Sequence, residues 1–264
     1  MSEFLPCLKG RRRVLLFLDY DGTLTPVRKT PELAVLSSSR RRLLERLNLN
    51  ILVCIVSGRS LGDVRRLVSI RNIAYIGNHG LEMTYRNLRW THPEAVRTRP
   101  VLRDALARIR QMTKPWPGLL VEDKGLTGSV HYRSLAAPLP GELRGLVEGE
   151  VLSRGGALKL TEGKKVFEIR PSMAWDKGKG VREFIRRLDI RGPVLRIYIG
   201  DDQTDEDAFR ALTPGDITIR VGGRHDSLAR HRLPNVAAVW KFLDDLVRMT
   251  TPPRPGSPRR GRSA

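Results

Sequence analysis

Residues 14–25 read VLLFLDYDGTLT. The stretch opens with an unbroken apolar run, 14–18, which is followed by two carboxylates separated by one residue. A continuous apolar run of this length, bounded by turn residues, is typical of a strand buried on both faces. Asp19 and Asp21 stand where this strand runs out, and Gly22 permits a turn directly after them. Asp-Gly is also ordinary turn material and aspartate caps helices, so this stretch alone does not separate a functional site from a simple turn.

The same kind of strand recurs along the chain and alternates with helical patterns. Apolar runs predict buried strands at 51–57, 72–77, 195–201 and 217–221, and helical periodicity predicts helices at 37–47, 60–68, 177–188, 205–212 and 240–249. Such alternation predicts a parallel sheet with helices on both faces, whose ligands lie at the carboxyl ends of the strands. The expected core is therefore α/β, a Rossmann-like doubly wound parallel sheet.

The pattern changes after Trp90. A helix near 98–113 and strands near 119–122 and 129–133 are followed by a helix near 142–153 and strands near 157–161 and 166–170. This duplicated pattern predicts a small antiparallel sheet with two helices on one face. We therefore expect an α+β cap domain at 98–174, inserted into a core domain made of 1–97 and 175–249, and a disordered basic tail at 250–264.

Two further strand ends carry polar residues. Ser57, Gly58 and Arg59 offer a hydroxyl and backbone donors before a helix N-terminus, which suits a phosphate, although Ser57 could be a plain cap in competition with Ser60. Residues 201–207 hold five acids in a chain whose 48 Lys and Arg against 28 Asp and Glu give a net charge of +20. Carboxylates that face one another raise one another's pKa and need a cation, and oxygen-only ligands favour Mg²⁺.

The composition excludes several classes of protein and of metal site. Cys7 and Cys54 form neither a disulfide framework nor a thiolate metal site, and the five histidines lack zinc-site spacing. No stretch nears the roughly 18 unbroken apolar residues of a membrane span, and the N-terminus has too little apolar length for a signal peptide, so we expect a cytoplasmic monomer without a membrane partner. The charge of +20 raises the alternative of nucleic-acid binding, but aromatics total only 6% and no basic stripe is interleaved with them, so we expect no specific nucleic acid.

Together these residues resemble the haloacid dehalogenase-type phosphatases, which carry four short motifs. The matching residues are, in motif order, Asp19 with Asp21, Ser57, Lys177, and Asp201 with Asp205. Finer matches between residues 17 and 209 are similar to the trehalose-6-phosphate phosphatase branch: LDYDGTLTP, VSGRS, GNHGLE, VEDKG, SVHYR, GKKVFEIRP, WDKGKG and IGDDQTDEDAF.

The resemblance implies a catalytic role for four residues. Asp19 would attack phosphorus and form an aspartyl-phosphate, which splits one hard hydrolysis into two steps. Asp21 would give a proton to the departing sugar oxygen and then take one from the attacking water. Lys177 and Ser57 would bind the phosphoryl oxygens.

The resemblance also implies a Mg²⁺ ion. It would be held by the Asp19 carboxylate, the Asp21 main-chain carbonyl and Asp201, and it would neutralise the charge between nucleophile and phosphate. Asp202 and Asp205 would orient the waters bound to the metal.

Substrate choice would come from the cap and from the seam between cap and core. The residues implied as substrate-binding are Arg59, Asn78, His79, Gly80, Glu122, Lys124, Arg133, Lys164 and Glu168. Each has a structural alternative: Glu122 and Lys124 could pair across a hairpin, Lys164 could decorate a turn, and a histidine such as His79 is more often structural than catalytic.

The preferred hypothesis is a Mg²⁺-dependent phosphoric monoester hydrolase that converts trehalose 6-phosphate to trehalose and phosphate, as in trehalose biosynthesis. The nearer alternative is a related phosphatase for another sugar phosphate, such as sucrose phosphate or a glucosyl or mannosyl glycerate phosphate. The alternative of a different class is a basic protein that binds nucleic acid or another polyanion.

Overall fold

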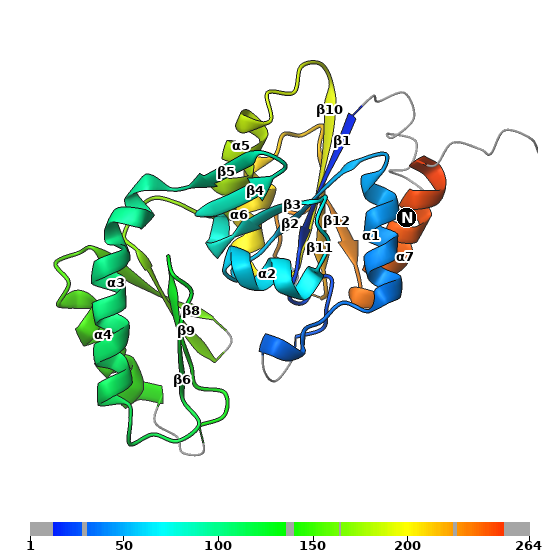
Figure 1. The fold of residues 1–264 in the computed structure, drawn as a ribbon. Coiled ribbons are helices and arrows are strands. Elements are labelled where there is room, and N and C mark those ends of the chain that lie inside the picture. Colours follow the sequence, from blue (N-terminus) through cyan, green and yellow to red (C-terminus); the bar gives the residue numbers. More distant parts are fainter. Residues whose placement is uncertain (1–12, 28–30, 136–139, 164, 224–225, 251–264) are drawn as a thin grey trace, which may run out of the picture.

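The computed structural model describes residues 13–27, 31–135, 140–163, 165–223 and 226–250, and these fold around two separate sheets (Figure 1). The larger sheet has eight strands in the order β12-β11-β10-β1-β2-β3-β4-β5. The smaller has four, in the order β6-β7-β9-β8. The small sheet with its helices stands to one side of the large one, beyond β5 and α2 (Figure 1).

The large sheet is parallel through its centre. Its strands are β1 (Arg13–Asp19), β2 (Leu52–Val56), β3 (Ala74–Gly77), β4 (Glu82–Tyr85), β5 (Leu88–Thr91), β10 (Val194–Gly200), β11 (Ile217–Val221) and β12 (His231–Leu233). The parallel core predicted from the sequence is confirmed for β1, β2, β3, β10 and β11. The strands β4 and β5 add an antiparallel hairpin at one edge and β12 adds a parallel strand at the other; the sequence predicted none of these three.

Helices cover both faces of the large sheet, which is why its central strands are apolar throughout. They are α1 (Ser38–Asn48), α2 (Leu61–Val68), α5 (Lys177–Arg187), α6 (Gln203–Ala211) and α7 (Val236–Thr250). Along β1, Leu16 and Leu18 pack with α1, α2 and α7, whereas Leu15 and Phe17 pack with α5 and α6 on the opposite face. Alternate side chains of one strand thus serve two different core layers.

The smaller sheet has its own apolar core. Its elements are α3 (Pro93–Met112), β6 (Leu120–Asp123), β7 (Gly128–His131), α4 (Pro140–Leu152), β8 (Leu158–Gly163) and β9 (Val166–Pro171). All strand pairs are antiparallel, and Leu106 of α3 and Leu143 of α4 pack against Val130, Phe167 and Ile169. Both helices lie on the same face of this sheet (Figure 1), so the helix-and-sheet arrangement predicted for the insert is present.

Two helices begin about one turn earlier than predicted. The helix α3 begins at Pro93 rather than near Thr98, with Pro93 in its first turn and Pro100 inside it. An interior proline removes a hydrogen bond and usually marks a helix start, which explains the misplaced boundary. The last helix begins at Val236 rather than Trp240 and extends through Thr250, while the rest of the predicted tail, 251–264, lies outside the described residues.

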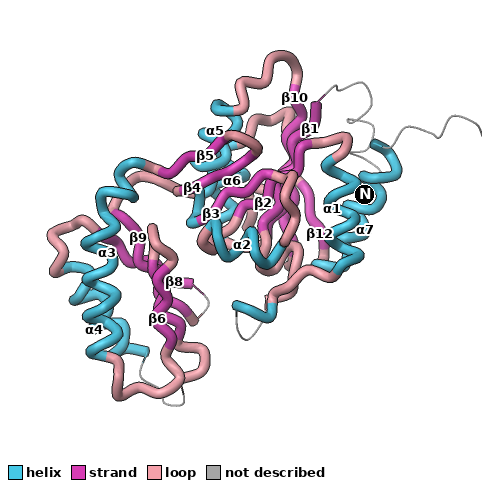
Figure 2. The backbone as a smooth tube through the Cα atoms, viewed as in Figure 1, coloured by secondary structure: helices cyan, strands magenta, loops and turns pink. Residues whose placement is uncertain are grey.

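The chain crosses between the two sheets twice, and aromatic rings join the two crossings. Trp90 and His92 lie on the outgoing segment and Trp175 on the returning one; the ring centroids of His92 and Trp175 are 4.5 Å apart and those of Trp90 and Trp175 5.7 Å. The Arg187 guanidinium lies over the Trp90 ring, 5.0 Å from its centroid. The outgoing and returning segments therefore run side by side (Figure 2). No helix in the described ranges is both long enough and apolar enough to span a bilayer.

Candidate active site

The carboxyl ends of three neighbouring strands bring the first predicted residues together. Because β1 lies between β10 and β2, Asp19, Asp201 and Ser57 end up at one edge of the sheet. A cavity of about 850 Å³ opens there, walled by the large sheet on one side and the small sheet on the other. Its lining includes the predicted residues Asp19, Asp21, Ser57, Arg59, His79, Glu122, Lys124, Arg133, Glu168, Lys177, Asp201 and Asp202.

Asp19 is buried at the end of β1. Its Oδ1 accepts a hydrogen bond of 2.7 Å from Lys177 Nζ, whereas its Oδ2, also buried, has no hydrogen-bond partner among the residues that the structure describes. Burial raises the pKa of the Asp19 carboxyl well above its usual range, and the nearby Asp205 and Asp201 add to the shift while Lys177 opposes it. A buried oxygen without a donor or cation is costly, so this atom needs a ligand.

Lys177 is the charge at the centre of the site. It begins α5, whose N-cap Asp176 accepts a bond from Lys179 N, and its buried ammonium donates to Asp19 Oδ1 and Asp205 Oδ1, both at 2.7 Å. Burial alone would lower the pKa of Lys177, but Asp19 and Asp205 raise it above its ordinary value. The ammonium therefore stays charged throughout the physiological range.

A cluster of carboxylates fits a hard divalent cation. Asp19, Asp201 and Asp205 each present an oxygen, and these atoms lie within 4.8 Å of one another. Burial, with Asp205 as the next contribution, raises the pKa of Asp201 to about 6, although Thr23 Oγ1 donates to it at 3.1 Å. Together with Asp19 Oδ2, which lacks a partner in the described part of the chain, this oxygen-only set suits Mg²⁺.

Asp205 differs from the other two acids because protein donors already hold it. Its Oδ1 accepts from Lys177 and from Tyr198 OH at 2.8 Å, and its Oδ2 accepts from Asp202 N at 2.9 Å. Asp202 in turn accepts from Gln203 N, so the pair forms a capping box at the start of α6. These bonds fix the acidic turn that follows β10.

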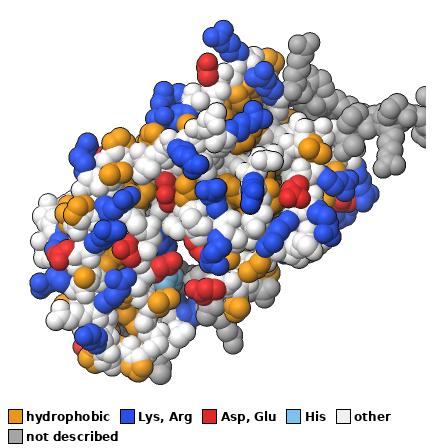
Figure 3. Space-filling model, in the orientation of Figure 1, with side chains coloured by type: hydrophobic (Ala, Val, Ile, Leu, Met, Phe, Trp, Pro, Cys, Tyr) orange, Lys and Arg blue, Asp and Glu red, His pale blue; other side chains and the backbone are white. Residues whose placement is uncertain are grey.

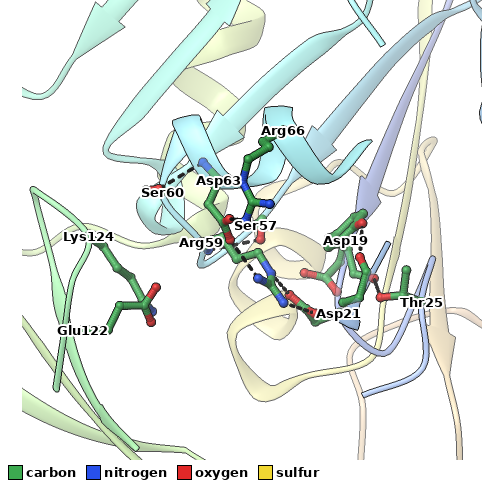
Figure 4. A network of polar contacts seen from close by, with 12 residues as sticks. Asp19, Asp21, Thr25, Ser57, Arg59, Ser60, Asp63, Arg66, Glu122 and Lys124 are labelled. Carbon is green, nitrogen blue, oxygen red and sulfur yellow. Dashed lines mark hydrogen bonds and ion pairs between the residues drawn. The ribbon is translucent and has the colours of Figure 1, made fainter. Parts of the chain in front are cut away.

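Asp21 and Arg59 form a bidentate ion pair. Arg59 Nε lies 2.6 Å from Asp21 Oδ2 and Nη2 lies 2.8 Å from Oδ1, while Nη1 reaches Asp63 Oδ2 at 2.8 Å (Figure 4). Arg59 N also donates to Ser57 Oγ at 3.1 Å. Arg59 therefore binds the predicted proton donor Asp21 through its guanidinium, and the same residue belongs to the predicted phosphate loop, residues 57–59, where its main-chain N–H contacts Ser57.

The predicted cap residues face this loop across the cavity. Glu122 and Lys124 point toward Arg59 and Asp21 in Figure 4. They do not pair with each other: Lys124 Nζ lies 3.2 Å from Glu168 Oε1, and Glu122 Oε2 lies 3.0 Å from His131 Nε2. Each carboxylate is thus held by a partner within the small sheet.

The other predicted substrate-binding residues fall into three groups. Asn78 and Gly80 are buried and do not line the cavity, and Lys164 lies outside the described residues. His79 does line it, and burial, followed by the charge of Arg170, lowers the pKa of its imidazole well below the usual range. Arg170 Nη2 lies 2.9 Å from His79 Nε2, so Arg170 joins core and small sheet directly.

Arg170 was missed from the sequence, although a signal for it exists. It lies two residues after Glu168 on β9, and alternate residues of a strand share a face. Both side chains accordingly line the cavity, together with Lys159 and Thr161 from β8, which were also missed. The period of two along β8 and β9 would have identified all of them.

Comparison with known proteins gives a consistent result. The sequence matches the trehalose-phosphatase family over residues 17–233. The trehalose-phosphate phosphatase of Mycobacterium tuberculosis is 36% identical over 246 residues, which cover 90% of this chain and 62% of that protein, and trehalose-phosphate phosphatase B of Arabidopsis thaliana is 34% identical over 262 residues, covering 93% and 69%. The crystal structure of a trehalose-6-phosphate phosphatase related protein has a TM-score of 0.79 at 26% identity, covering 89% of this chain and 97% of that one. The chain therefore spans about 62% of the length of its mycobacterial relatives.

Proposed function

The chain belongs to the trehalose-phosphatase family, and we propose that it is a Mg²⁺-dependent phosphatase that hydrolyses trehalose 6-phosphate to trehalose and phosphate through an aspartyl-phosphate. The observation that carries the proposal is Asp19, a buried carboxylate with one oxygen that has no partner among the described residues, at a cavity whose opposite wall is lined by polar side chains of the small sheet. A phosphate monoester placed between these walls puts phosphorus at Asp19 and the sugar at the small sheet.

Asp19 and Asp21, at the end of β1, carry out the first half of the reaction. An Asp19 oxygen forms a bond to phosphorus while the bond from phosphorus to the sugar oxygen breaks, and Asp21 supplies the proton that the leaving sugar oxygen takes up. Lys177, fixed by Asp19 and Asp205, and the Ser57 hydroxyl hold the phosphoryl oxygens.

The second half reverses the roles. Asp21 takes a proton from a water molecule as that water attacks the aspartyl-phosphate, which releases phosphate and restores Asp19. When Mg²⁺ is bound, held by the Asp19 carboxylate, the Asp21 main-chain carbonyl and Asp201, it neutralises charge between the nucleophile and the phosphate. Asp202 and Asp205, at the capped start of α6, would orient waters bound to the ion.

Sugar recognition is assigned to the small sheet. Glu122, Lys124, Arg133 and Glu168 line the cavity and alternate acceptors with donors, which suits hydroxyls that play both roles. We assign residues 98–174 to a cap domain and residues 1–97 and 175–249 to the core, in a cytoplasmic monomer. On the face shown in Figure 3, Lys and Arg side chains are dispersed rather than gathered into one stripe, and this face therefore does not favour specific nucleic-acid binding.

The test compares phosphate release from trehalose 6-phosphate, sucrose 6-phosphate and glucose 6-phosphate in the presence of Mg²⁺. We expect trehalose 6-phosphate to have the highest kcat/KM, and equal values on all three would refute the substrate assignment. Asp19→Asn should reduce turnover more than about a thousandfold with the fold retained by circular dichroism. Asp244→Asn, at an exposed acid of α7 that pairs with Arg248, is the matched control and should leave turnover unchanged.

A further inference from the structure

The segment that follows β3 has an unusual backbone. Asn78, His79 and Gly80 are consecutive and have φ of 47°, 56° and 95°. Left-handed backbone is costly for residues other than glycine, although asparagine tolerates it better than most. Such a conformation persists where surrounding contacts hold it in place.

Those contacts converge on the Asn78 side chain, which is completely buried. Its Nδ2 donates to Glu82 Oε1 at 2.5 Å and to the main-chain carbonyl of Lys124 at 3.1 Å, and its Oδ1 accepts from Thr127 Oγ1 at 2.6 Å. A carboxylate and a carbonyl can only accept, so they fix which end of the amide is nitrogen. Both amide protons are used, and two of the three partners belong to the small sheet's side of the cavity.

The main chain of the same segment is bound to the predicted phosphate loop. Asn78 N donates to Arg59 O at 2.7 Å and His79 N donates to Ser57 O at 3.1 Å. Glu82 extends the link, because the Oε1 that accepts from Asn78 also accepts from Leu61 N at the start of α2. These main-chain bonds fix Asn78 to the loop that would hold the phosphoryl group, and they do not depend on the Asn78 side chain.

On the other side, Asn78 holds the turn between β6 and β7. Lys124 N donates to Thr127 O at 2.9 Å across this turn, and the Asn78 amide bonds to both of these residues. The Lys124 ammonium donates a hydrogen bond to Glu168 Oε1 in the cavity wall. The Asn78 amide thus binds the main chain of Lys124, while the Lys124 side chain lines the cavity.

We propose that Asn78 is a specificity-determining positioning residue: from a buried position outside the cavity, it fixes the distance between the phosphate loop and the sugar-facing turn of the small sheet. This inference rests on the proposed phosphatase function. A substrate with a phosphoryl group and a sugar needs both walls at a set spacing, whereas a small aryl phosphate needs only the core wall. We call the hydrogen bonds from the Asn78 amide to Lys124 and Thr127 the bridge. Weakening this bridge should therefore lower kcat/KM for the sugar phosphate and not for the aryl phosphate.

The test changes Thr127, which reaches Asn78 but does not line the cavity. Thr127→Val keeps the shape and removes the donor, and Thr127→Ser keeps the donor. With Mg²⁺ present, we expect Thr127→Val to lower kcat/KM for trehalose 6-phosphate about tenfold, chiefly through KM, and to leave kcat/KM for p-nitrophenyl phosphate within twofold. Thr127→Ser should behave as wild type on both substrates.

A matched control is Thr113→Val, another buried threonine of the small-sheet unit, whose hydroxyl donates to Ile109 O at 2.7 Å within α3. It should leave the ratio of the two kcat/KM values unchanged. A second variant, Asn78→Gly, suits the left-handed backbone and removes the whole bridge. It should lower the same ratio at least as much as Thr127→Val, and the double variant should add nothing further.

An unchanged ratio in Thr127→Val overturns the inference, as does an equal loss on both substrates. If Thr127→Val does not fold by circular dichroism, the ratio measured for Asn78→Gly decides in the same way. A wild-type enzyme that shows no preference for trehalose 6-phosphate over p-nitrophenyl phosphate refutes the proposed function instead, so the two failures are distinguishable.

Discussion

Lys177 Nζ donates to Asp19 Oδ1 at 2.7 Å, although 158 residues separate the two in the sequence. The same ammonium donates to Asp205 at the same distance, so one cation lies between two buried carboxylates. This arrangement ties β1, α5 and α6 together at the strand ends. It also sets the electrostatics of the site before any ligand arrives.

The first prediction concerns the stability of the metal-free protein. Lys177→Met leaves Asp19 and Asp205 without their shared cation, and removing one partner of a buried ion pair costs about 3–5 kcal/mol. The free energy of unfolding in urea with EDTA should fall by that amount. Lys179→Met, two residues along the same helix and half exposed, is the control and should change it by less than about 1 kcal/mol. Equal midpoints for the two variants would contradict this account.

The second prediction concerns metal binding. Mg²⁺ should raise the thermal midpoint of the wild-type protein, because it supplies the partner that Asp19 Oδ2 lacks within the described residues and relieves the repulsion around Asp201. EDTA should abolish phosphate release. In Asp201→Asn the Mg²⁺-dependent rise should disappear, whereas Asp207→Asn, in the same acidic stretch but within α6 and paired with Arg210, should retain it. A full rise in Asp201→Asn would remove that residue from the ligand set.

The third prediction separates the geometry of Arg59 from its charge. Lysine keeps the charge but cannot hold Asp21 with two prongs while also reaching Asp63. Arg59→Lys should lower kcat/KM for trehalose 6-phosphate by about 10–100-fold, corresponding to roughly 1.4–2.7 kcal/mol. Arg66→Lys, at an exposed partner of the same Asp63, should stay within twofold. If both variants lose activity equally, Asp63 rather than Asp21 is the partner that matters.

The fourth prediction is a pH dependence of stability. His79 has a pKa well below its ordinary 6.5 because it is buried and faces Arg170, Lys177 and Lys124. Below about pH 6.5 the unfolded chain therefore binds a proton that the folded chain does not, and the free energy of unfolding falls as pH is lowered, by at most about 1.4 kcal/mol per pH unit from this group.

In His79→Asn this fall should become shallower between pH 6.5 and 5, although His92, whose pKa burial also lowers, still contributes in the same direction. The measurement is a series of urea titrations across that range. A slope identical to that of the wild type would show that His79 is protonated in the folded state.

The central strands could be predicted because burial on both faces leaves a short apolar run bounded by turn residues. The hairpin of β4 and β5 lacks such a run, since both strands are short and β5 is only partly buried. Its two-residue turn is Arg86-Asn87, and Arg86 has φ of 51° at the first turn position, where asparagine or glycine is the usual hairpin signal. Local sequence therefore contains little trace of these strands, and packing beside β3 decides them.

The residues of the candidate site likewise fall into those that the sequence could predict and those that it could not. Residues at strand ends, such as Asp19 and Ser57, could be found because their position follows from the strands themselves. The bridge from Asn78 to Thr127 spans 49 residues and depends on how the small sheet docks, so no spacing in the sequence reveals it. The resemblance placed Asn78 among sugar contacts, whereas its amide is occupied by neighbours within the protein.

The contact of His92 with Trp175 has a consequence for how this architecture diversifies. Because the outgoing and returning segments meet ring to ring, excising everything between them would leave two chain ends close enough for a short connection, and the eight-stranded sheet would remain intact. Evolution can thus exchange the unit to which we assign sugar recognition, while the sheet to which we assign phosphate-ester cleavage is inherited unaltered.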